Sequence, residues 1–246
     1  MDFVTEPASP ADNVQRFRFS DSGEGPVTML LHGFPDGPES WEATRAALVD
    51  AGNRVVVPYL RGYHPDTLVE GRSYGHVQTG GDIVWLLDHL GVDRATLVGH
   101  DWGASAVWSA AASYPERVDG IVPIAIPHPA TLKPSLKLGW QTRHFGFFKA
   151  PLSDQRTARN DFAYIDTLYD RWAPNWTGPD RVSTLARAKE LFADPVVLHE
   201  ALQWYRDLLL TPDPASDFRV GCPGLLVAGG DDFDGSETVD LLSFAE

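Results

Sequence analysis

Two segments of different residue pattern meet at Gly99-His100-Asp101-Trp102-Gly103. The apolar run at residues 95–98 predicts a buried strand, and the small residues at 104–114 predict a helix. A nucleophile that lies in such a sharp strand-to-helix turn is exposed at the end of the strand. Glycines on both sides of Asp101 remove the Cβ atoms that would clash in a strained turn. The stretch therefore predicts that Asp101 is a nucleophile.

A carboxylate nucleophile limits the classes of substrate that the protein can act on. Its attack on a carboxylic ester or amide would give an anhydride, whereas its attack on a saturated carbon that bears a leaving group gives an alkyl ester. Epoxides and alkyl halides are substrates of this kind. The alternative is that the Gly-x-Asp-x-Gly pattern is an accidental turn, but the flanking strand and helix and a matching loop upstream argue against it.

The matching loop is His32-Gly33-Phe34-Pro35, which follows the apolar run at residues 27–31. In folds that carry a nucleophile in this kind of turn, the loop after the neighbouring strand donates one backbone N–H to an oxyanion hole, and the residue after the nucleophile donates the other. By position, the two donors are Phe34 and Trp102. Pro35 has no N–H and shapes the loop without donating.

Strand and helix patterns alternate along the first half of the chain. Strands are predicted at 14–19, 27–31, 54–58, 95–98 and 118–126, and helices at 39–51, 77–90 and 104–114. This alternation predicts an α/β fold with a mostly parallel, doubly wound sheet. Residues 129–216 lack strand periodicity and predict a helical cap over the strand ends, and 224–228 predict a return to the sheet. The predicted domains are a core at 1–128, a cap at 129–216 and a second core part at 217–246.

Several motifs along residues 17–232 resemble the epoxide hydrolase branch of the α/β-hydrolases. They are His32-Gly33-Phe34-Pro35, Trp41, Arg61-Gly62-Tyr63, the stretch 99–104, Pro115-Glu116-Arg117-Val118 and Ile126-Pro127-His128-Pro129. Gln203-Trp204-Tyr205-Arg206 resembles the cap motif that carries a ring-opening tyrosine in this branch. The resemblance implies an α/β-hydrolase fold with an inserted helical cap, and epoxide hydrolysis through a covalent alkyl ester on Asp101.

The mechanism that the resemblance implies uses two cap tyrosines, which stabilise the alkoxide that forms when the ring opens. Tyr205 matches one of them. Phe145 stands at the place of the other and has no hydroxyl group, and Tyr164 and Tyr169 are candidates to replace it. For the tryptophans of the cap we expect ordinary aromatic packing.

The triad order of this fold is nucleophile, acid, histidine. The acid is expected after the strand at 224–228, where the spacing selects Asp232, with Asp231 and Asp234 as alternatives. None of the 14 residues after Asp232 is histidine. We therefore expect the last strand and helix of the fold to be missing from this sequence. The ester would then form but not be hydrolysed, unless His128 or His144 acts as the base.

Two other readings of the function remain open. One is a haloalkane dehalogenase, because those enzymes also carry a tryptophan beside the nucleophile, whose indole N–H holds the halide. The other is a non-catalytic member of the fold that binds a small apolar ligand under its cap, which the absent histidine favours. The Tyr205 motif and the His-Gly-Phe-Pro loop fit the epoxide branch better than the dehalogenases.

The composition excludes some partners. The 246 residues carry a net charge of −14, which argues against nucleic acid and anionic membrane surfaces. No secretory signal or membrane-spanning run is visible, so the cytoplasm is the expected location. The single cysteine, Cys222, predicts a packing residue. Neither metal-ligand spacing nor a phosphate-binding loop is present, so no cofactor is expected. The expected partner is a small apolar epoxide or halide, and a homodimer is left open.

Overall fold

The computed structural model of the chain describes residues 1–7, 16–68, 73–131, 134–207 and 219–229. The candidate acid Asp232 and its alternatives Asp231 and Asp234 lie outside these ranges. Within them the chain forms a six-stranded sheet of order β1-β2-β4-β3-β5-β6. The strands are β1 (Val4–Pro7), β2 (Arg16–Ser22), β3 (Val27–Leu31), β4 (Arg54–Pro58), β5 (Ala95–His100) and β6 (Val118–Ile124).

The sheet is mostly parallel, as the alternation of strand and helix patterns predicts. β3 pairs in parallel with β4 and with β5, and β5 pairs in parallel with β6. β2 pairs antiparallel with β1 and with β4 at one edge of the sheet. After β6, residues Gly224 and Val227 form isolated parallel bridges to Ile121 and Ile124, so the predicted strand at 224–228 returns to the β6 edge.

Some boundaries differ from the predicted ones for reasons of pairing. β2 continues to Ser22, because Asp21 and Ser22 pair with β4 in the antiparallel ladder. β6 ends at Ile124, because Ala125 has a positive φ of 68° that no strand continues through. β1 was not expected from the sequence. It is a short edge strand whose residues pair only with β2.

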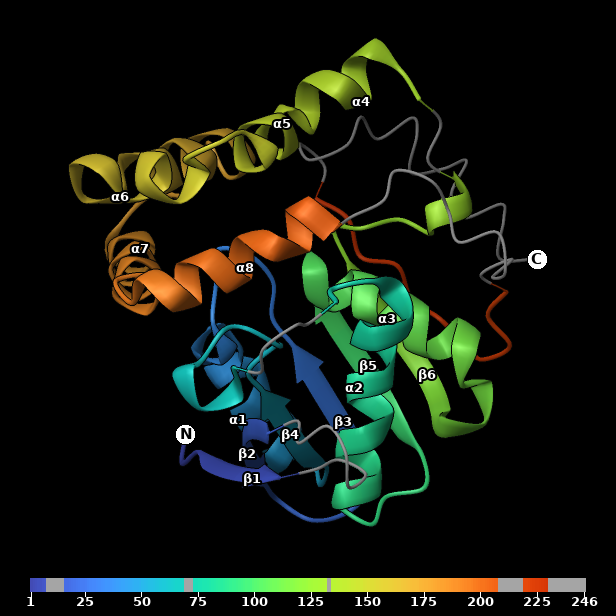
Figure 1. Cartoon of the computed structure of the whole chain (residues 1–246). Coiled ribbons are helices and arrows are strands. Elements are labelled where there is room, and N and C mark those ends of the chain that lie inside the picture. Colours follow the sequence, from blue (N-terminus) through green and yellow to red (C-terminus); the bar gives the residue numbers. More distant parts are fainter. Residues whose placement is uncertain (8–15, 69–72, 132–133, 208–218, 230–246) are drawn as a thin grey trace.

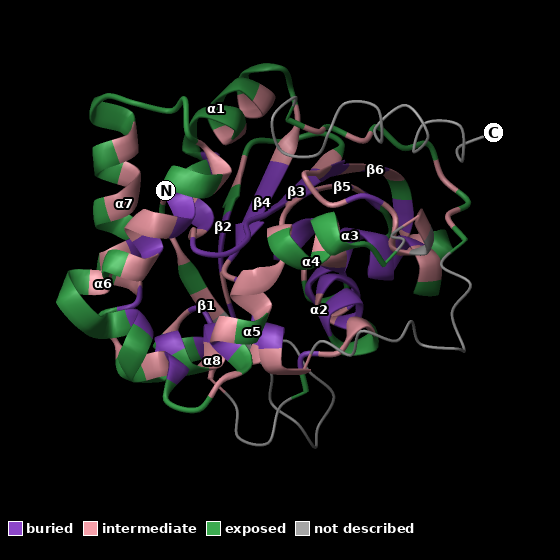
Figure 2. Ribbon diagram, turned by 90° about the horizontal axis from the view of Figure 1, so that it is seen from above, coloured by how far each residue is buried: buried purple, intermediate pink, exposed green. Residues whose placement is uncertain are grey.

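Helices cover both faces of the sheet (Figure 2). α1 (Glu42–Asp50) lies on one face, and α2 (His76–His89) and α3 (Trp102–Ser113) lie on the other. Each strand contributes side chains to the cores on both faces of the sheet, because successive side chains point to opposite sides. Met29 and Leu31 join the larger core cluster with α2 and α3, whereas Leu30 of the same strand joins the smaller cluster around Trp41.

Short 3₁₀ turns complete this core. They are η1 (Pro38–Trp41), η2 (Pro65–Thr67), η3 (Pro115–Arg117) and η4 (Pro129–Thr131). Each of the four begins with proline, whose fixed φ suits the first position of a helical turn.

Five further helices, which we call the helical layer, lie above the sheet at the carboxyl ends of its parallel strands (Figure 1). They are α4 (Leu136–Gln141), α5 (Arg143–Lys149), α6 (Ser153–Trp172), α7 (Pro179–Leu191) and α8 (Pro195–Asp207). α6 is kinked, because residues 160–162 have positive φ angles. In the described ranges, no helix has the length and apolar character needed to cross a membrane.

Hydrogen bonds join the helical layer to the loops that follow β3 and β4, among them one from the Tyr74 hydroxyl to Glu200 in α8. The indole N–H of Trp204 in α8 donates to the Arg61 carbonyl at 3.1 Å. The backbone N–H of Tyr74 donates to the Asp207 carboxylate at 3.0 Å, and the hydroxyl of Tyr169 donates to Asp36. The layer is thus held directly over the strand ends, where open α/β sheets bind ligands.

Candidate active site

Asp101 occupies a strained turn between β5 and α3. Its φ of 52° and ψ of −117° lie outside the regions that non-glycine residues commonly adopt. A Cβ atom on Gly99 would lie 2.4 Å from the carbonyl carbon of Gly103, and a Cβ on Gly103 would lie 2.2 Å from the Leu31 carbonyl oxygen. The predicted reason for the two glycines is therefore confirmed: β3, β5 and α3 approach one another too closely for any side chain there.

The backbone N–H of Phe34 donates to Oδ1 of Asp101 at 2.9 Å. The backbone N–H of Trp102 also approaches the Asp101 carboxylate and lowers its pKa. The two amides that the sequence singles out thus lie beside Asp101. Burial raises the pKa of Asp101, and nearby Asp36 raises it further, while His100 and the two amides act in the opposite direction. The donors hold the carboxylate in one orientation in a site that disfavours its charge.

His32 positions the loop that carries Phe34. Its Nε2 accepts the backbone N–H of Leu60 at 3.0 Å, and its Nδ1 lies 3.2 Å from the Gly33 carbonyl oxygen. These partners require the neutral tautomer with the proton on Nδ1. Burial lowers the pKa of His32 to about 4, which keeps the ring neutral at pH 7. Both nitrogens are engaged in the backbone, so His32 has a structural role.

Aromatic rings enclose Asp101 from above. Tyr205 of α8 lies edge-on to Trp102 with 4.8 Å between ring centroids, and 5.4 Å from Phe34. Phe145 and Phe148 of α5 lie 5.1 and 4.6 Å from Tyr205. Tyr205 is almost completely buried, with 1% of its surface exposed. Tyr205 is therefore shielded from bulk water by aromatic rings, and such burial strengthens electrostatic interactions.

Three polar atoms in this aromatic environment have no hydrogen-bond partner: the hydroxyls of Tyr63 and Tyr205 and the indole N–H of Trp102. In the described part of the chain, the other such buried atoms belong to Arg18 and Trp41. A buried polar group without a partner costs about 1–3 kcal/mol. A site that binds a hydrogen-bond acceptor is expected to hold donors without partners when no ligand is bound. The hydroxyls of Tyr63 and Tyr205 and the indole N–H of Trp102 fit this expectation.

The charge of Asp101 acts on both phenols. Burial raises the pKa of Tyr205 well above its ordinary value, and the charges of Asp101 and Tyr63 raise it further. The indole N–H of Trp102 approaches the Tyr205 hydroxyl and lowers its pKa, although the two groups make no hydrogen bond of normal geometry. Burial likewise raises the pKa of Tyr63, followed by the charges of Asp101 and Asp36.

The structure gives different surroundings to the tyrosines proposed as replacements for the absent cap tyrosine. Phe145 does lie at the site, in contact with Tyr205 and stacked 6.0 Å from Trp102. Tyr169 uses its hydroxyl to donate to Asp36. Tyr164 is partly exposed and stacks on Phe147 at 3.7 Å. The hydroxyl of Tyr169 is therefore already in use, and the ring of Tyr164 packs on Phe147.

The unpaired hydroxyl of Tyr63 is a functional feature that the sequence does not predict. In the sequence, Tyr63 is only part of the Arg61-Gly62-Tyr63 motif. The motif indicates a loop after β4 and contains no signal for the direction of the side chain. The sequence does place this loop next to the one that carries Phe34, because β4 and β3 are neighbouring parallel strands.

Two histidines considered as alternative bases lie near the site or at its edge. His144 of α5 lies 5.6 Å from the Tyr205 ring, and burial lowers its pKa to about 4. Its Nδ1 lies 3.2 Å from the Gln141 carbonyl oxygen. His128, after β6, packs edge-on against Trp108 at 5.0 Å. His144 is thus a neutral imidazole beside the aromatic environment of Asp101.

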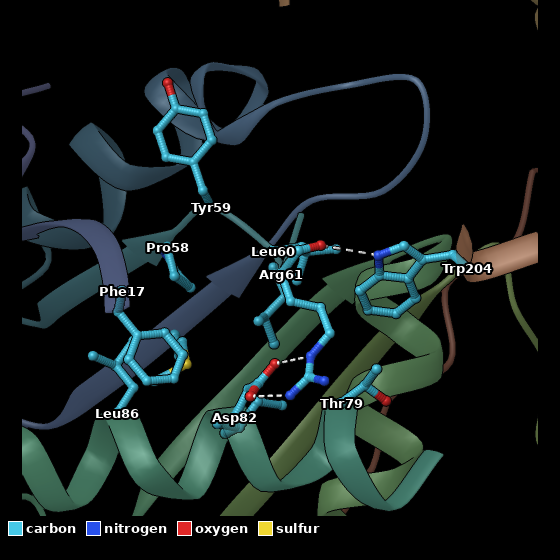
Figure 3. A pocket seen from close by; sticks show the side chains of 12 residues that line it. Phe17, Pro58, Tyr59, Leu60, Arg61, Thr79, Asp82, Leu86 and Trp204 are labelled. Atoms are coloured by element: carbon cyan, nitrogen blue, oxygen red, sulfur yellow. Dashed lines mark hydrogen bonds and ion pairs between the residues drawn. The ribbon is translucent and has the colours of Figure 1, made fainter. Parts of the chain in front are cut away.

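A small separate cavity of about 20 Å³ lies below the site, between the sheet and α2 (Figure 3). Its wall includes Arg61, which is paired with Asp82 at 2.5 Å, and Trp204, which donates to the Arg61 carbonyl. The volume suits about one water molecule. The described residues also contain no cluster of three or more histidine, cysteine or acidic residues that would bind a metal ion.

Comparisons with known proteins identify relatives of this chain. The AB hydrolase superfamily protein YfhM of Bacillus subtilis (strain 168) is 34% identical over 194 residues, which cover 75% of this chain and 66% of that protein. Epoxide hydrolase A of Mycobacterium tuberculosis (strain H37Rv) is 40% identical over 118 residues, or 47% of this chain and 37% of that protein. The chain thus spans only part of the length of these relatives.

A solved structure of the epoxide hydrolase CorEH without ligand superposes with a TM-score of 0.78, over 94% of this chain and 83% of that chain. At 19% sequence identity this likeness shows the fold alone. Residues 26–184 match the family described as alpha/beta hydrolase fold. This range includes the turn at Asp101, the residues Phe34 and Trp102, and most of the helical layer. The chain therefore belongs to the α/β hydrolase fold family.

Proposed function

We propose that the protein is a hydrolase that opens an epoxide through a covalent ester on Asp101. The observation that carries this proposal is the orientation of the carboxylate. Oδ1 accepts the Phe34 amide at 2.9 Å, which leaves Oδ2 available for attack. The epoxide as substrate is supported by curated relatives named epoxide hydrolase, including the one from Mycobacterium tuberculosis. The helical layer would form the cap that the sequence predicts at 129–216 and that closes over the substrate.

In the first step, Oδ2 of Asp101 attacks an epoxide carbon. The new O–C bond forms as the ring C–O bond breaks, and the electron pair moves to the ring oxygen. The Tyr205 hydroxyl donates a hydrogen bond and then its proton to this oxygen. Formation of the ester also removes the charge of Asp101, which raises the pKa of Tyr205 in the free protein. The attack therefore makes Tyr205 a better acid at the moment when a proton is needed.

In the second step, water attacks the ester carbonyl carbon. Negative charge then develops on Oδ1, the atom that already accepts the Phe34 amide, so the amides of Phe34 and Trp102 act as the oxyanion hole. A general base must activate this water. We assign the acid that supports the base to Asp232. The bond between the carbonyl carbon and the alkyl oxygen then breaks, the base passes the proton from water to that oxygen, and the diol leaves with the Asp101 carboxylate restored.

The test is direct detection of the ester. Brief incubation of the purified chain with styrene oxide, followed by an acid quench, is expected to increase the intact mass by one epoxide per chain. Peptide mapping is expected to place the added mass on Asp101. Diol formation without any ester, or an ester on another residue, would contradict the proposal. A folded protein that reacts with no epoxide would support a ligand-binding role instead.

Haloalkane hydrolysis is a second candidate function, and the unpaired indole N–H of Trp102 favours it. A halide leaving from carbon is an acceptor that this donor would stabilise. The two functions differ in their need for Tyr205, because a halide leaves as a stable anion and an alkoxide does not. The remaining sequence expectations, a cytoplasmic location and a homodimer among them, stay predictions.

Tyr205→Phe is expected to slow ester formation from styrene oxide by roughly 10²-fold, the scale of losing one well-placed donor. It is expected to change ester formation from a 1-haloalkane by less than about twofold. Quenched-flow sampling with intact-mass detection measures both rates. Equal losses with both substrates would mean that Tyr205 only packs, and a larger loss with the halide would contradict its role as the acid for the epoxide oxygen.

A further inference from the structure

The proposed site has one phenol where its resemblance implies two. Phe145 lies at the expected place and carries no hydroxyl group. Tyr169 donates to Asp36, and Tyr164 is partly exposed and stacked on Phe147. A second hydrogen-bond donor to the epoxide oxygen therefore has to come from another residue, or the site works with Tyr205 alone.

Tyr63 is held against the site by a tight turn after β4. Its backbone N–H donates to the Leu60 carbonyl at 3.0 Å, which closes the turn around Gly62. Gly62 has a φ of +83°, and a Cβ atom there would lie 2.7 Å from the Tyr74 hydroxyl and 2.9 Å from Cβ of Glu200. The turn thus tolerates no other residue at this position and directs Tyr63 inward, beneath the helical layer.

The Tyr63 ring is completely buried, with 0% of its surface exposed. It packs edge-on against His32, with 4.8 Å between centroids, and lies 6.0 Å from Phe192. Phe192 in turn lies 5.3 Å from Phe34, the residue whose amide holds Asp101. Tyr63 therefore belongs to the same aromatic environment as Tyr205, but it enters from the core side instead of from α8.

The Tyr63 hydroxyl has acceptors nearby and uses none of them. Asp101 and Asp36 lie close enough for their charges to raise the pKa of Tyr63, yet the hydroxyl makes no hydrogen bond to either carboxylate. His32 cannot accept from it, because both ring nitrogens are occupied by the backbone. A buried phenol that costs stability in the free protein is explained if a bound substrate supplies its acceptor.

We propose that Tyr63 is a further catalytic residue. Its hydroxyl donates the second phenolic hydrogen bond to the epoxide oxygen, from the β4 side of the site, in place of the hydroxyl that Phe145 lacks. This inference rests on the proposed function. No proton needs to leave Tyr63 in this step, because Tyr205 transfers the proton and Tyr63 only donates a hydrogen bond to the developing alkoxide. The fold then uses one phenol from the core and one from the helical layer.

The test is Tyr63→Phe, which removes only the unpaired hydroxyl. Ester formation from styrene oxide is expected to slow by at least about 10-fold, and ester formation from a 1-haloalkane to change little. The midpoint of thermal unfolding is expected to stay the same or rise, because a buried polar atom without a partner is removed. A structural hydroxyl would give the opposite result, a lower midpoint.

Tyr114→Phe is the matched control, since Tyr114 ends α3 away from Asp101 and is partly exposed. It is expected to leave both rates unchanged. An unchanged epoxide rate in Tyr63→Phe would overturn the inference, and so would a variant that fails to fold. If the unmodified chain forms no ester at all, the proposed function fails and this inference fails with it. If that ester forms equally fast in Tyr63→Phe, only the role of Tyr63 is wrong.

Discussion

Asp101→Asn is expected to abolish ester formation with styrene oxide and to raise the midpoint of thermal unfolding at pH 7. The amide oxygen is far less nucleophilic than a carboxylate oxygen, so no adduct should form. Asparagine still accepts the Phe34 amide, so the turn is preserved. Intact-mass measurement after a quench and a thermal unfolding scan check the two halves of the prediction.

The stabilisation follows from the sign of the pKa shift at Asp101. Burial raises its pKa, so the folded protein binds the proton more tightly than the unfolded chain does. The contribution of Asp101 to stability therefore falls as the pH rises above the ordinary carboxyl value of about 3.9 and stays low at neutral pH. The neutral amide avoids this loss. The midpoint difference between variant and parent is expected to shrink as the pH is lowered towards 4.

Asp119→Asn is the control, because Asp119 is exposed and paired with Arg94 on the surface. It is expected to keep the adduct and the unfolding midpoint. Adduct formation within minutes in Asp101→Asn would exclude Asp101 as the nucleophile. Slow recovery over hours, accompanied by a mass increase of about one dalton, would instead report deamidation of the asparagine back to aspartate.

Gly103→Ala is expected to destabilise the chain by about 4 kcal/mol or more, or to prevent folding. The added Cβ would lie 2.2 Å from the Leu31 carbonyl oxygen and 2.6 Å from that of His32. Both neighbours are backbone atoms of the central strand and its loop, so neither can rotate away as a side chain would. Chemical denaturation followed by circular dichroism measures the loss.

Gly146→Ala is the matched control for this prediction. Gly146 lies in α5, and no atom lies within 4 Å of the position its Cβ would take. Alanine is favoured over glycine in a helix by up to about 1 kcal/mol, so this variant is expected to be neutral or more stable. Similar stabilities for the two variants would show that the close approach of β3 to the elbow is not required.

The sequence predicted the sharp turn at Asp101 because the residues that form this turn are neighbours in the chain. Gly99 and Gly103 flank Asp101 within one turn, and the strand before it and the helix after it each have a clear periodicity. A parallel strand in the middle of a sheet is buried on both faces, so nearly all of its residues are apolar. The ends of such an apolar run therefore lie close to the ends of the strand, as at residues 27–31 and 54–58. Edge strands carry a weaker pattern, which is why β1 was not expected.

By itself, then, the sequence determined the α/β arrangement, the sharp turn that carries Asp101 and the loop whose amide holds the Asp101 carboxylate. Only the tertiary structure decided which hydroxyls are free to act. Tyr169 is engaged because Asp36, 133 residues away, lies beneath it, whereas Tyr63 is buried with no partner. Whether a buried donor finds an acceptor depends on how the helical layer packs on the strand ends. That packing joins segments far apart in the chain, and no local residue pattern records it.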